Sequence, residues 1–204
     1  MKVAVVDYNM GNLASVVNAL KRVGAEATIL KDPEKFRKFD KMILPGVGAF
    51  GDAMEHLRLY DMVEPIKEFA ASGKPLLGIC LGMQLLLEKS YEFGEHEGLG
   101  LIEGEVVPFD RSRFFERLKI PHMGWNELFV KKESPIFKGL PKEIYLYFVH
   151  SYHAVCEDRF VIGETLYGYR FASALQSENI FGLQPHPEKS HEIGLSILKN
   201  FVEL

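Results

Sequence analysis

Cys80 is the residue whose setting most directly indicates chemistry. It stands in Gly78-Ile79-Cys80-Leu81-Gly82, after a short apolar run and before a helical pattern. A nucleophile at the turn from a strand into a helix lies on a tight, strained backbone, and the residues next to it must be small. The first N–H groups of the following helix also favour the thiolate, the reactive form of cysteine. An inert packed cysteine is the ordinary alternative, but the two glycines and the position favour the nucleophile.

A second group of reactive residue types lies near the end of the chain, in QPHPEKS, residues 184–190. Prolines on both sides disfavour a helix at His186. In an extended chain, side chains two residues apart leave on the same side, so the Glu188 carboxylate can stand beside the His186 imidazole. It would then fix the tautomer of the ring and support its positive charge, as the acid of a Cys-His-acid set does. Alone, the segment is equally well a surface loop; together with Cys80, the catalytic interpretation leads.

A third stretch, Pro45-Gly46-Val47-Gly48, follows an apolar run and indicates an oxyanion site. A glycine-rich turn at the carboxyl end of a parallel strand exposes backbone N–H groups. Those of Val47 and Gly48, with that of Leu81, are candidates to hold the oxyanion formed when a thiolate attacks a carbonyl. A phosphate-binding turn or a plain loop is the alternative. The stretch lacks the spacing and lysine of a P-loop and the third glycine of a dinucleotide-binding turn.

Four histidines in the second half raise the question of a metal. None follows zinc-site spacing with a companion cysteine, and His186 is better explained by the acid beside it. We therefore expect neither a metal site nor a cofactor. The four are His150, His153, His186 and His191.

Composition narrows the class of protein. The chain has 204 residues, of which 47% are hydrophobic, and a formal net charge of −4, which suits one domain spanning 1–204 with a substantial core. No basic block is present, so a nucleic-acid partner is not expected. No apolar run approaches the roughly 18–20 residues of a membrane span, and the start is too short in apolar length for a signal peptide. Two cysteines make no disulfide framework, and the expected location is the cytoplasm.

The periodicity of apolar residues predicts the elements that position these groups. The first half alternates strands and helices, which favours a doubly wound, mostly parallel α/β sheet. We expect strands at 2–7, 26–30, 41–44 and 75–79, a helix capped by Asn12 and ended by Gly24, and helices at 51–59, 62–72 and 81–89. The second half favours antiparallel strands added at one edge, at 102–108, 124–130, 145–149, 153–156 and 160–166. A strand at 179–183 and a helix at 190–202 close the chain.

With these motifs in this order, the sequence resembles the class I, triad-type glutamine amidotransferases over nearly its whole length. The shared pattern is a GxCxG turn, a late HPE and a glycine-rich oxyanion loop. Within that family, four further stretches are similar to the glutaminase subunit of imidazole glycerol phosphate synthase of histidine biosynthesis. They are DYNMGNL (7–13), PGVGAFGDAM (45–54), PHMGWN (121–126) and YFVHSY (147–152). Segments typical of the anthranilate synthase and pyridoxal phosphate synthase glutaminases are missing.

The resemblance implies a flavodoxin-like fold and a reaction in which Cys80 attacks the side-chain amide of glutamine. His186 would protonate the departing ammonia and then activate water against the glutamyl thioester. Residues that match positions holding the substrate glutamine are Gly48, Gln84, Ser151 and Tyr152.

The resemblance also implies a partner, a (β/α)₈-barrel cyclase subunit that receives the ammonia in a heterodimer. The oxyanion loop around Val47 would be unproductive until that partner binds its own ligand. Residues that match positions near the contact are Asn12, Trp125, Tyr147 and Lys189. A core anchor is the equally weighted alternative for Trp125, and an ordinary strand position for Tyr147.

One residue departs from the family pattern, because Pro185 stands where an aromatic is usual. Proline is poorly tolerated inside a paired strand, so we expect the last strand to end at Gln184 and the packing beneath His186 to differ. Two other functions stay open. One is a glutaminase for another synthase or a free-standing cysteine hydrolase, active without a cyclase. The other is an idle docking subunit of similar fold.

Overall fold

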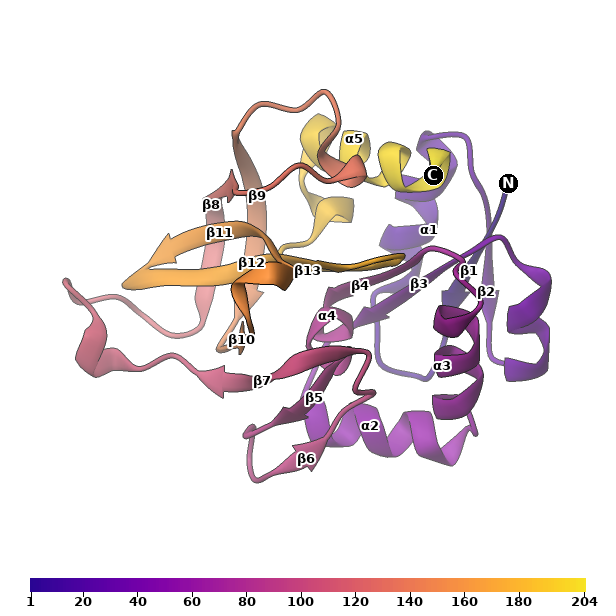
Figure 1. The fold of residues 1–204 in the computed structure, drawn as a ribbon, viewed down its shortest axis with the longest axis horizontal. Coiled ribbons are helices and arrows are strands. Elements are labelled where there is room, and N and C mark those ends of the chain that lie inside the picture. Colours follow the sequence, from indigo (N-terminus) through magenta and orange to yellow (C-terminus); the bar gives the residue numbers. More distant parts are fainter.

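Short strands build the parallel part of the sheet, as the apolar runs predict, and three of them, β3, β4 and β13, are buried along their whole length, while the edge strand β2 is largely exposed. The computed structural model describes all residues 1–204. Neighbouring strands in the order β2-β1-β3-β4-β13 all run parallel (Figure 1). Their bounds are β1 Lys2–Val6, β2 Glu26–Leu30, β3 Lys41–Gly46, β4 Leu76–Cys80 and β13 Ile180–Leu183.

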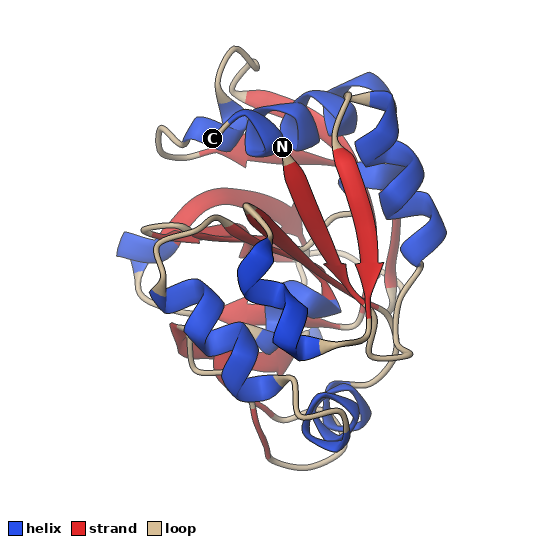
Figure 2. Cartoon of the chain, turned by 90° about the vertical axis from the view of Figure 1, so that its right-hand side faces the viewer, coloured by secondary structure: helices blue, strands red, loops and turns tan.

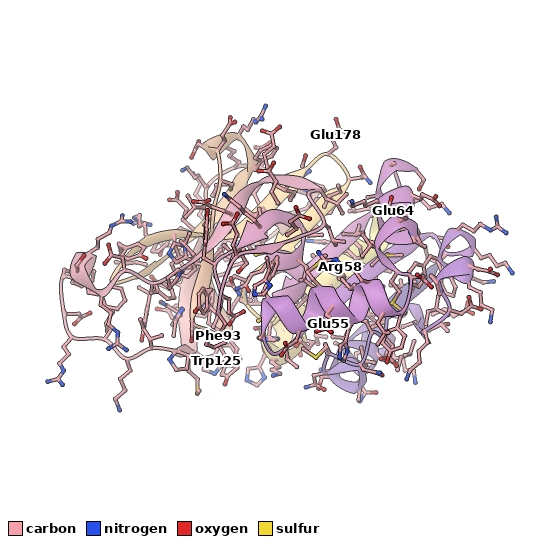
Figure 3. All side chains as sticks on the ribbon, turned by 90° about the horizontal axis from the view of Figure 1, so that it is seen from below. Glu55, Arg58, Glu64, Phe93, Trp125 and Glu178 are labelled. Carbon is pink, nitrogen blue, oxygen red and sulfur yellow. The ribbon has the colours of Figure 1, made fainter.

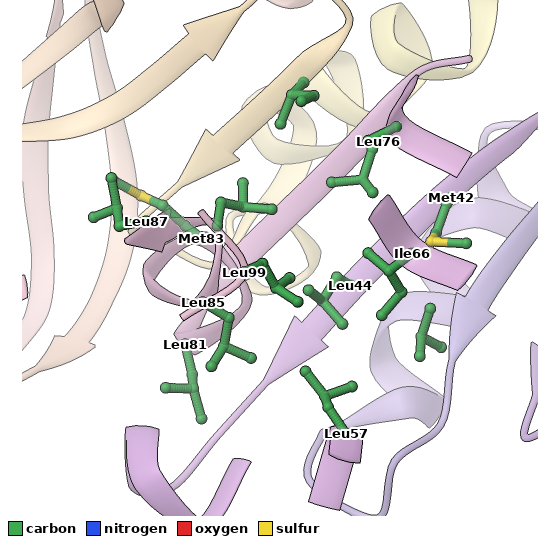
Figure 4. Close-up of a cluster of buried hydrophobic side chains, with 14 of the residues drawn as sticks. Met42, Leu44, Leu57, Ile66, Leu76, Leu81, Met83, Leu85, Leu87 and Leu99 are labelled. Carbon is green, nitrogen blue, oxygen red and sulfur yellow. The ribbon is translucent and has the colours of Figure 1, made fainter. Parts of the chain in front are cut away.

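Helices cover both faces of this parallel part (Figure 2). The bounds are α1 Leu13–Arg22, α2 Phe50–Leu59, α3 Val63–Ala71 and α5 His191–Glu203. Apolar side chains of α2 and α3 share one core cluster, part of which Figure 4 shows, while those of α1 and α5 share a second. Successive side chains of the buried strands point to opposite faces of the sheet and so pack alternately in the two clusters, as the period-two geometry of a strand requires. The prediction of a doubly wound α/β fold is confirmed.

Beyond β13 the second half of the chain adds antiparallel strands, as predicted, and the sheet ends in two short strands from residues 87–97, the first of which runs parallel to its neighbour β7. The order continues β12-β10-β7-β5-β6, while β11, β8 and β9 branch off through β11 as a ribbon. The bounds are β5 Leu87–Ser90, β6 His96–Glu97, β7 Ile102–Pro108, β8 His122–Val130, β9 Glu143–His150, β10 Tyr152–Val155, β11 Val161–Tyr167 and β12 Tyr169–Ser177. Short 3₁₀ turns lie at Pro33–Lys38, Arg111–Arg113, Pro135–Phe137, Asp158–Phe160 and Pro187–Lys189.

The predicted helix over 81–89 is wrong in its second half. Helix α4 covers only Leu81–Leu85, and the chain then enters β5. The carbonyl oxygens of Leu85 and Leu86 accept hydrogen bonds from the N–H groups of Leu99 and Leu101, both at 2.8 Å. These contacts with a distant segment replace the next helical turn, so tertiary pairing overrides the helical spacing of the apolar residues. The strand β12 was not among the predicted elements.

One smaller prediction needs revision, and the expected end of the last strand before Pro185 is confirmed. Asn12 occupies the N-cap position of α1, but its side chain makes no capping hydrogen bond, so it does not cap the helix as expected. Strand β13 ends at Leu183, yet the Gln184 N–H still donates to Ser173 O at 2.9 Å. The ladder therefore stops just before Pro185, which has no N–H to give. None of the helices is both long and apolar enough to cross a membrane.

Candidate active site

Cys80 sits at the junction of β4 and α4 with a backbone that few residues adopt. Its φ is 54° and its ψ is −111°, a strained conformation for a residue with a side chain. The glycines on either side serve close packing rather than unusual angles. A Cβ on Gly82 would lie 1.8 Å from Leu44 O, and one on Gly78 would lie 2.6 Å from Gly82 O. The strain is thus carried by the cysteine itself, and the glycines let the turn pack against β3.

His186 and Glu188 form the pair that the sequence predicts, but by a different local geometry. His186 Nδ1 and Glu188 Oε1 are 2.8 Å apart, and both side chains are 2% exposed. The chain after His186 is the 3₁₀ turn Pro187–Lys189 rather than an extended segment, so the predicted extended alternation is wrong. The backbone of His186 is held by its N–H to Tyr147 O at 2.8 Å. The Ser190 hydroxyl donates to His186 O at 2.6 Å, which closes the turn.

The imidazole of His186 is placed to hold a positive charge. Burial alone lowers the pKa of His186, but interactions with the Cys80 sulfur and with Glu188 outweigh it and raise the pKa to about 10. Because Nδ1 faces Glu188, Nε2 is the nitrogen left to exchange a proton. It is buried and has no hydrogen-bond partner. The ring thus has the Glu188 carboxyl group on its Nδ1 side, where it supports a positive charge on the imidazole.

The Cys80→Ser variant is expected to lower the pKa of His186. The Cys80 sulfur is the largest of the influences that raise it, so a neutral hydroxyl removes that support. In the wild-type protein the imidazole should keep its proton until the pH approaches about 10, and in the variant it should lose the proton at lower pH. Nuclear magnetic resonance of the labelled ring follows this titration, with Cys156→Ser as control. An identical titration in both variants would contradict the coupling.

One cavity gathers the side chains that the sequence singles out. Its volume is about 320 Å³, and Cys80 and His186 both face it. The full lining is Val47, Gly48, Cys80, Leu81, Gln84, Glu92, Val149, His150, Ser151, Tyr152 and His186. Every residue predicted for the oxyanion site and for glutamine is in this set. A larger hollow, of about 870 Å³ and lined in part by the turn Pro33–Lys38, contains no cysteine or histidine, so it offers no comparable chemistry.

The oxyanion loop is fixed at its base and open at its tip. The buried hydroxyl of Tyr8 donates to Pro45 O at 2.8 Å, where β3 ends. Gly48 has a φ of +101°, which favours glycine, and the Val47 side chain is 41% exposed. The roles of Val47, Gly48 and Leu81 as oxyanion donors stay predictions.

Two residues of the site escaped the sequence reasoning. The carboxylate of Glu92 lines the cavity and accepts the Phe50 N–H at 2.7 Å, and burial raises its pKa. Gln184 is fully buried, and its Nε2 lies 3.8 Å from Cys80 Sγ while its Oε1 accepts from Gln84 Nε2 at 3.1 Å. Glu92 stands in a polar loop without a motif, so its sequence carries no signal for the site. Gln184 adjoins the HPE motif, which is the one clue to it.

Three of the four residues predicted to face a partner, Trp125, Tyr147 and Lys189, lie against one another. Trp125 is 48% exposed on β8 and lies on the surface in Figure 3, so it is not a core anchor. Its ring stacks on His191 at 5.0 Å and meets Tyr147 edge-on at 6.2 Å, and Lys189 Nζ lies 5.9 Å from the Tyr147 ring centre. Asn12 is exposed and lines a small depression together with His186 and Glu188, the residue before Lys189. Their role in an interface stays a prediction.

Comparisons with known proteins agree with this geometry. The family model described as "Glutamine amidotransferase class-I" matches residues 4–204. The imidazole glycerol phosphate synthase subunit HisH of Sulfurimonas denitrificans is 66% identical over 202 residues, covering 98% of this chain and 97% of that protein. The subunit of the same name from Wolinella succinogenes is 63% identical over 203 residues, covering 99% of each.

Solved structures show the same fold at low identity. The structure of PurLQS from Thermotoga maritima matches with a TM-score of 0.77 at 23% identity, covering 99% of this chain and 97% of that one. A glutamine amidotransferase from the same organism matches with a TM-score of 0.70 at 13% identity, covering 100% and 96%. The family model matches almost the whole chain, and Cys80 at its strained turn lines one cavity with His186 of the histidine–glutamate pair. This chain belongs to the class-I glutamine amidotransferase family.

Proposed function

We propose that this chain is the glutamine-hydrolysing subunit of an imidazole glycerol phosphate synthase in histidine biosynthesis. The observation that carries the proposal is that Cys80 and His186 line the same cavity. On the other side of the imidazole, Nδ1 is hydrogen-bonded to Glu188. The relatives at 63% and 66% identity, which bear that name over nearly the whole chain, support the choice of synthase. The cytoplasm is the location that fits such an enzyme.

The reaction follows from the positions of these groups. The Cys80 thiolate attacks the amide carbon of the glutamine side chain, and the carbonyl oxygen takes the negative charge. Backbone N–H groups of Val47, Gly48 and Leu81 are proposed to hold that oxyanion. His186 gives its Nε2 proton to the leaving nitrogen, which departs as ammonia and leaves a glutamyl thioester. His186 then takes a proton from water, which attacks the thioester and releases glutamate and the free thiolate.

The cavity also offers a place for the amino-acid end of glutamine. Free glutamine carries an α-ammonium and an α-carboxylate beyond its side chain. Glu92 is the one acidic side chain in the cavity lining, and a carboxylate there matches the ammonium. Gln84, Ser151 and Tyr152 are proposed to complete the contacts. A Glu92→Gln variant is included in the assay below, where the ammonium contact predicts a higher KM for glutamine.

We further propose that a (β/α)₈-barrel cyclase subunit receives the ammonia in a heterodimer. Trp125 and Tyr147 supply exposed aromatic surface with Lys189 beside them, a composition typical of interface hot spots. The exposed tip of the loop at Val47 is suited to rearrange when the partner binds its ligand. In the absence of the partner the oxyanion site is then incomplete.

Release of glutamate from glutamine tests the function. The purified chain is expected to be nearly silent alone and to be stimulated strongly, by about a hundredfold or more, when the cyclase subunit and its nucleotide ligand are added. That magnitude corresponds to gaining one oxyanion donor. Trp125→Ala should weaken the stimulation by lowering affinity for the partner.

Two outcomes contradict the proposal in different ways. High activity of the chain alone removes the gating and favours a free hydrolase or another glutaminase. Silence of the chain in both conditions, with binding to the cyclase intact, favours the idle docking subunit.

A further inference from the structure

Three polar side chains of strands β8 and β9 form a row of hydrogen bonds, and the last of them lines the active-site cavity. Asn126 and His122 come from β8, and His150 is the last residue of β9. Asn126 Nδ2 is 3.1 Å from His122 Nε2, and His122 Nδ1 is 2.9 Å from His150 Nε2. His150 Nδ1 is 2.8 Å from Tyr152 O. We call Asn126, His122 and His150 the histidine relay.

The donors and acceptors of the histidine relay all point one way. Asn126 Oδ1 accepts the Glu127 N–H at 2.8 Å and Nδ2 donates to Leu166 O at 3.0 Å, which fixes the orientation of the amide. His122 Nε2 therefore faces a donor and must accept. Its proton is then on Nδ1, which donates to His150 Nε2. His150 in turn carries its proton on Nδ1 and donates to the Tyr152 carbonyl, so each ring has one tautomer.

The surroundings keep both rings neutral. The His122 ring stacks on Tyr167 at 4.0 Å and on Phe148 at 4.8 Å, and His122 and His150 are 2% and 6% exposed. Burial lowers the pKa of His122 to about 4 and that of His150 well below its usual range. A second proton on either ring would also set N–H against N–H. The histidine relay is thus a fixed set of hydrogen bonds rather than a reservoir of protons.

Its final acceptor is part of the active-site wall. The Tyr152 carbonyl also accepts from Gln84 Nε2 at 3.0 Å, and the same Nε2 donates to Gln184 Oε1 at 3.1 Å. Gln184 Nε2 lies 3.8 Å from Cys80 Sγ. One backbone carbonyl therefore joins the relay on one side to Gln84, Gln184 and the nucleophile on the other. At the opposite end, Asn126 follows the exposed Trp125 directly in sequence.

We propose that Asn126, His122 and His150 are positioning residues that hold the Tyr152 carbonyl, and through it Gln84, in the arrangement that binds glutamine. The inference rests on the proposed function, because it assigns these residues to glutamine binding. None of the three is proposed to take part in the chemistry. Loss of the relay should therefore raise the KM for glutamine and leave kcat nearly unchanged.

The test uses the complex with the cyclase subunit and its ligand. His122→Phe keeps an aromatic ring against Tyr167 but removes both ring nitrogens, and should raise the KM for glutamine about tenfold, with kcat within about threefold. Tenfold corresponds to losing one buried hydrogen bond. The matched control is His153→Phe. His153 is equally buried and packs on Phe109, but its bonds go to Ala154 O and the Tyr169 hydroxyl. The control should change KM by less than about twofold.

A second variant breaks the relay between the two histidines without removing a ring. Asn126→Asp places an acceptor opposite His122 Nε2, so the proton should move from Nδ1 to Nε2 and leave two bare nitrogens facing between the histidines. Nitrogen-15 resonances of the two rings report this change of tautomer directly. The KM for glutamine should again rise, while the rate at which iodoacetamide alkylates Cys80 stays the same, since that reagent needs no substrate pocket.

Several results would overturn the proposal. Equal effects of His122→Phe and His153→Phe would reduce the relay to ordinary packing, and so would a loss confined to kcat. A wild-type His122 with its proton on Nε2 would contradict the deduced direction. If the wild-type complex releases no glutamate, the proposed function fails instead, and the tautomers still test the relay.

Discussion

Replacing Cys80 with serine is expected to reduce glutamine hydrolysis by the complex by about 10³-fold or more. The serine hydroxyl is a far weaker nucleophile, and His186 and Glu188 at this site cannot make up the difference, since members of such a set act as a unit. The ammonia-dependent reaction of the cyclase subunit should persist, because added ammonia bypasses the glutaminase. The two rates are measured side by side on one preparation, with glutamine or with an ammonium salt.

The chain provides a matched control in its other cysteine. Cys156 is half-buried, and burial raises the pKa of its thiol to about 11, so it is poorly suited to act as a nucleophile. Cys156→Ser should keep both reactions. Substantial glutamine hydrolysis by Cys80→Ser would contradict the assignment of the nucleophile, and loss of the ammonia reaction would indicate damage to the partner contact instead.

Gly82→Ala is expected to destabilise the protein severely. The new Cβ would lie 1.8 Å from Leu44 O, a backbone atom of the fully buried strand β3, so neither side can move cheaply. We expect the free energy of unfolding to fall by about 4 kcal/mol or more, the range reserved for severe clashes in a core. Urea unfolding followed by circular dichroism measures the change.

Gly11→Ala is the comparison for that variant. A Cβ on Gly11 would meet the end of the Leu13 side chain at 3.3 Å, and a flexible side chain can give way. Its cost should be below about 1 kcal/mol, as for most substitutions without a buried clash. Similar unfolding midpoints for the two variants would show that α4 shifts away from β3 without penalty, against the packing described for the Cys80 turn.

The sequence predicts the parts of the site that depend on short-range pattern. The glycines two residues before and after Cys80 indicate a nucleophile turn, and the spacing of two residues between His186 and Glu188 indicates a pair. Even there the extended geometry was wrong, since Pro187 starts a 3₁₀ turn. The pair still forms because His186 itself is extended, with φ −99° and ψ 94°, just before the turn, and its N–H is held by Tyr147 O of β9.

What escaped prediction depends on contacts between distant segments. Glu92 faces the cavity only because β5 diverts the chain after five residues of α4, and that diversion is set by pairing with Leu99 and Leu101. The relay joins β8 to β9, in the hairpin register that puts His122 opposite His150. No local spacing encodes either arrangement. The proposed oxyanion donors come from the glycine-rich turn at the end of a strand, and the proposed partner residues come from the resemblance.

The position of β13 has a consequence for how the protein is made. This strand lies in the interior of the sheet, between β4 and β12, although it comes from residues 180–183 of 204. A chain still being translated has two unjoined sheets, each with an open edge that invites pairing with another molecule. Insertion of β13 between β4 and β12 closes both edges and brings His186, three residues after the strand, to the site. A chain truncated before β13 would lack His186, so we expect it to be inactive and, with two open sheet edges, prone to aggregate.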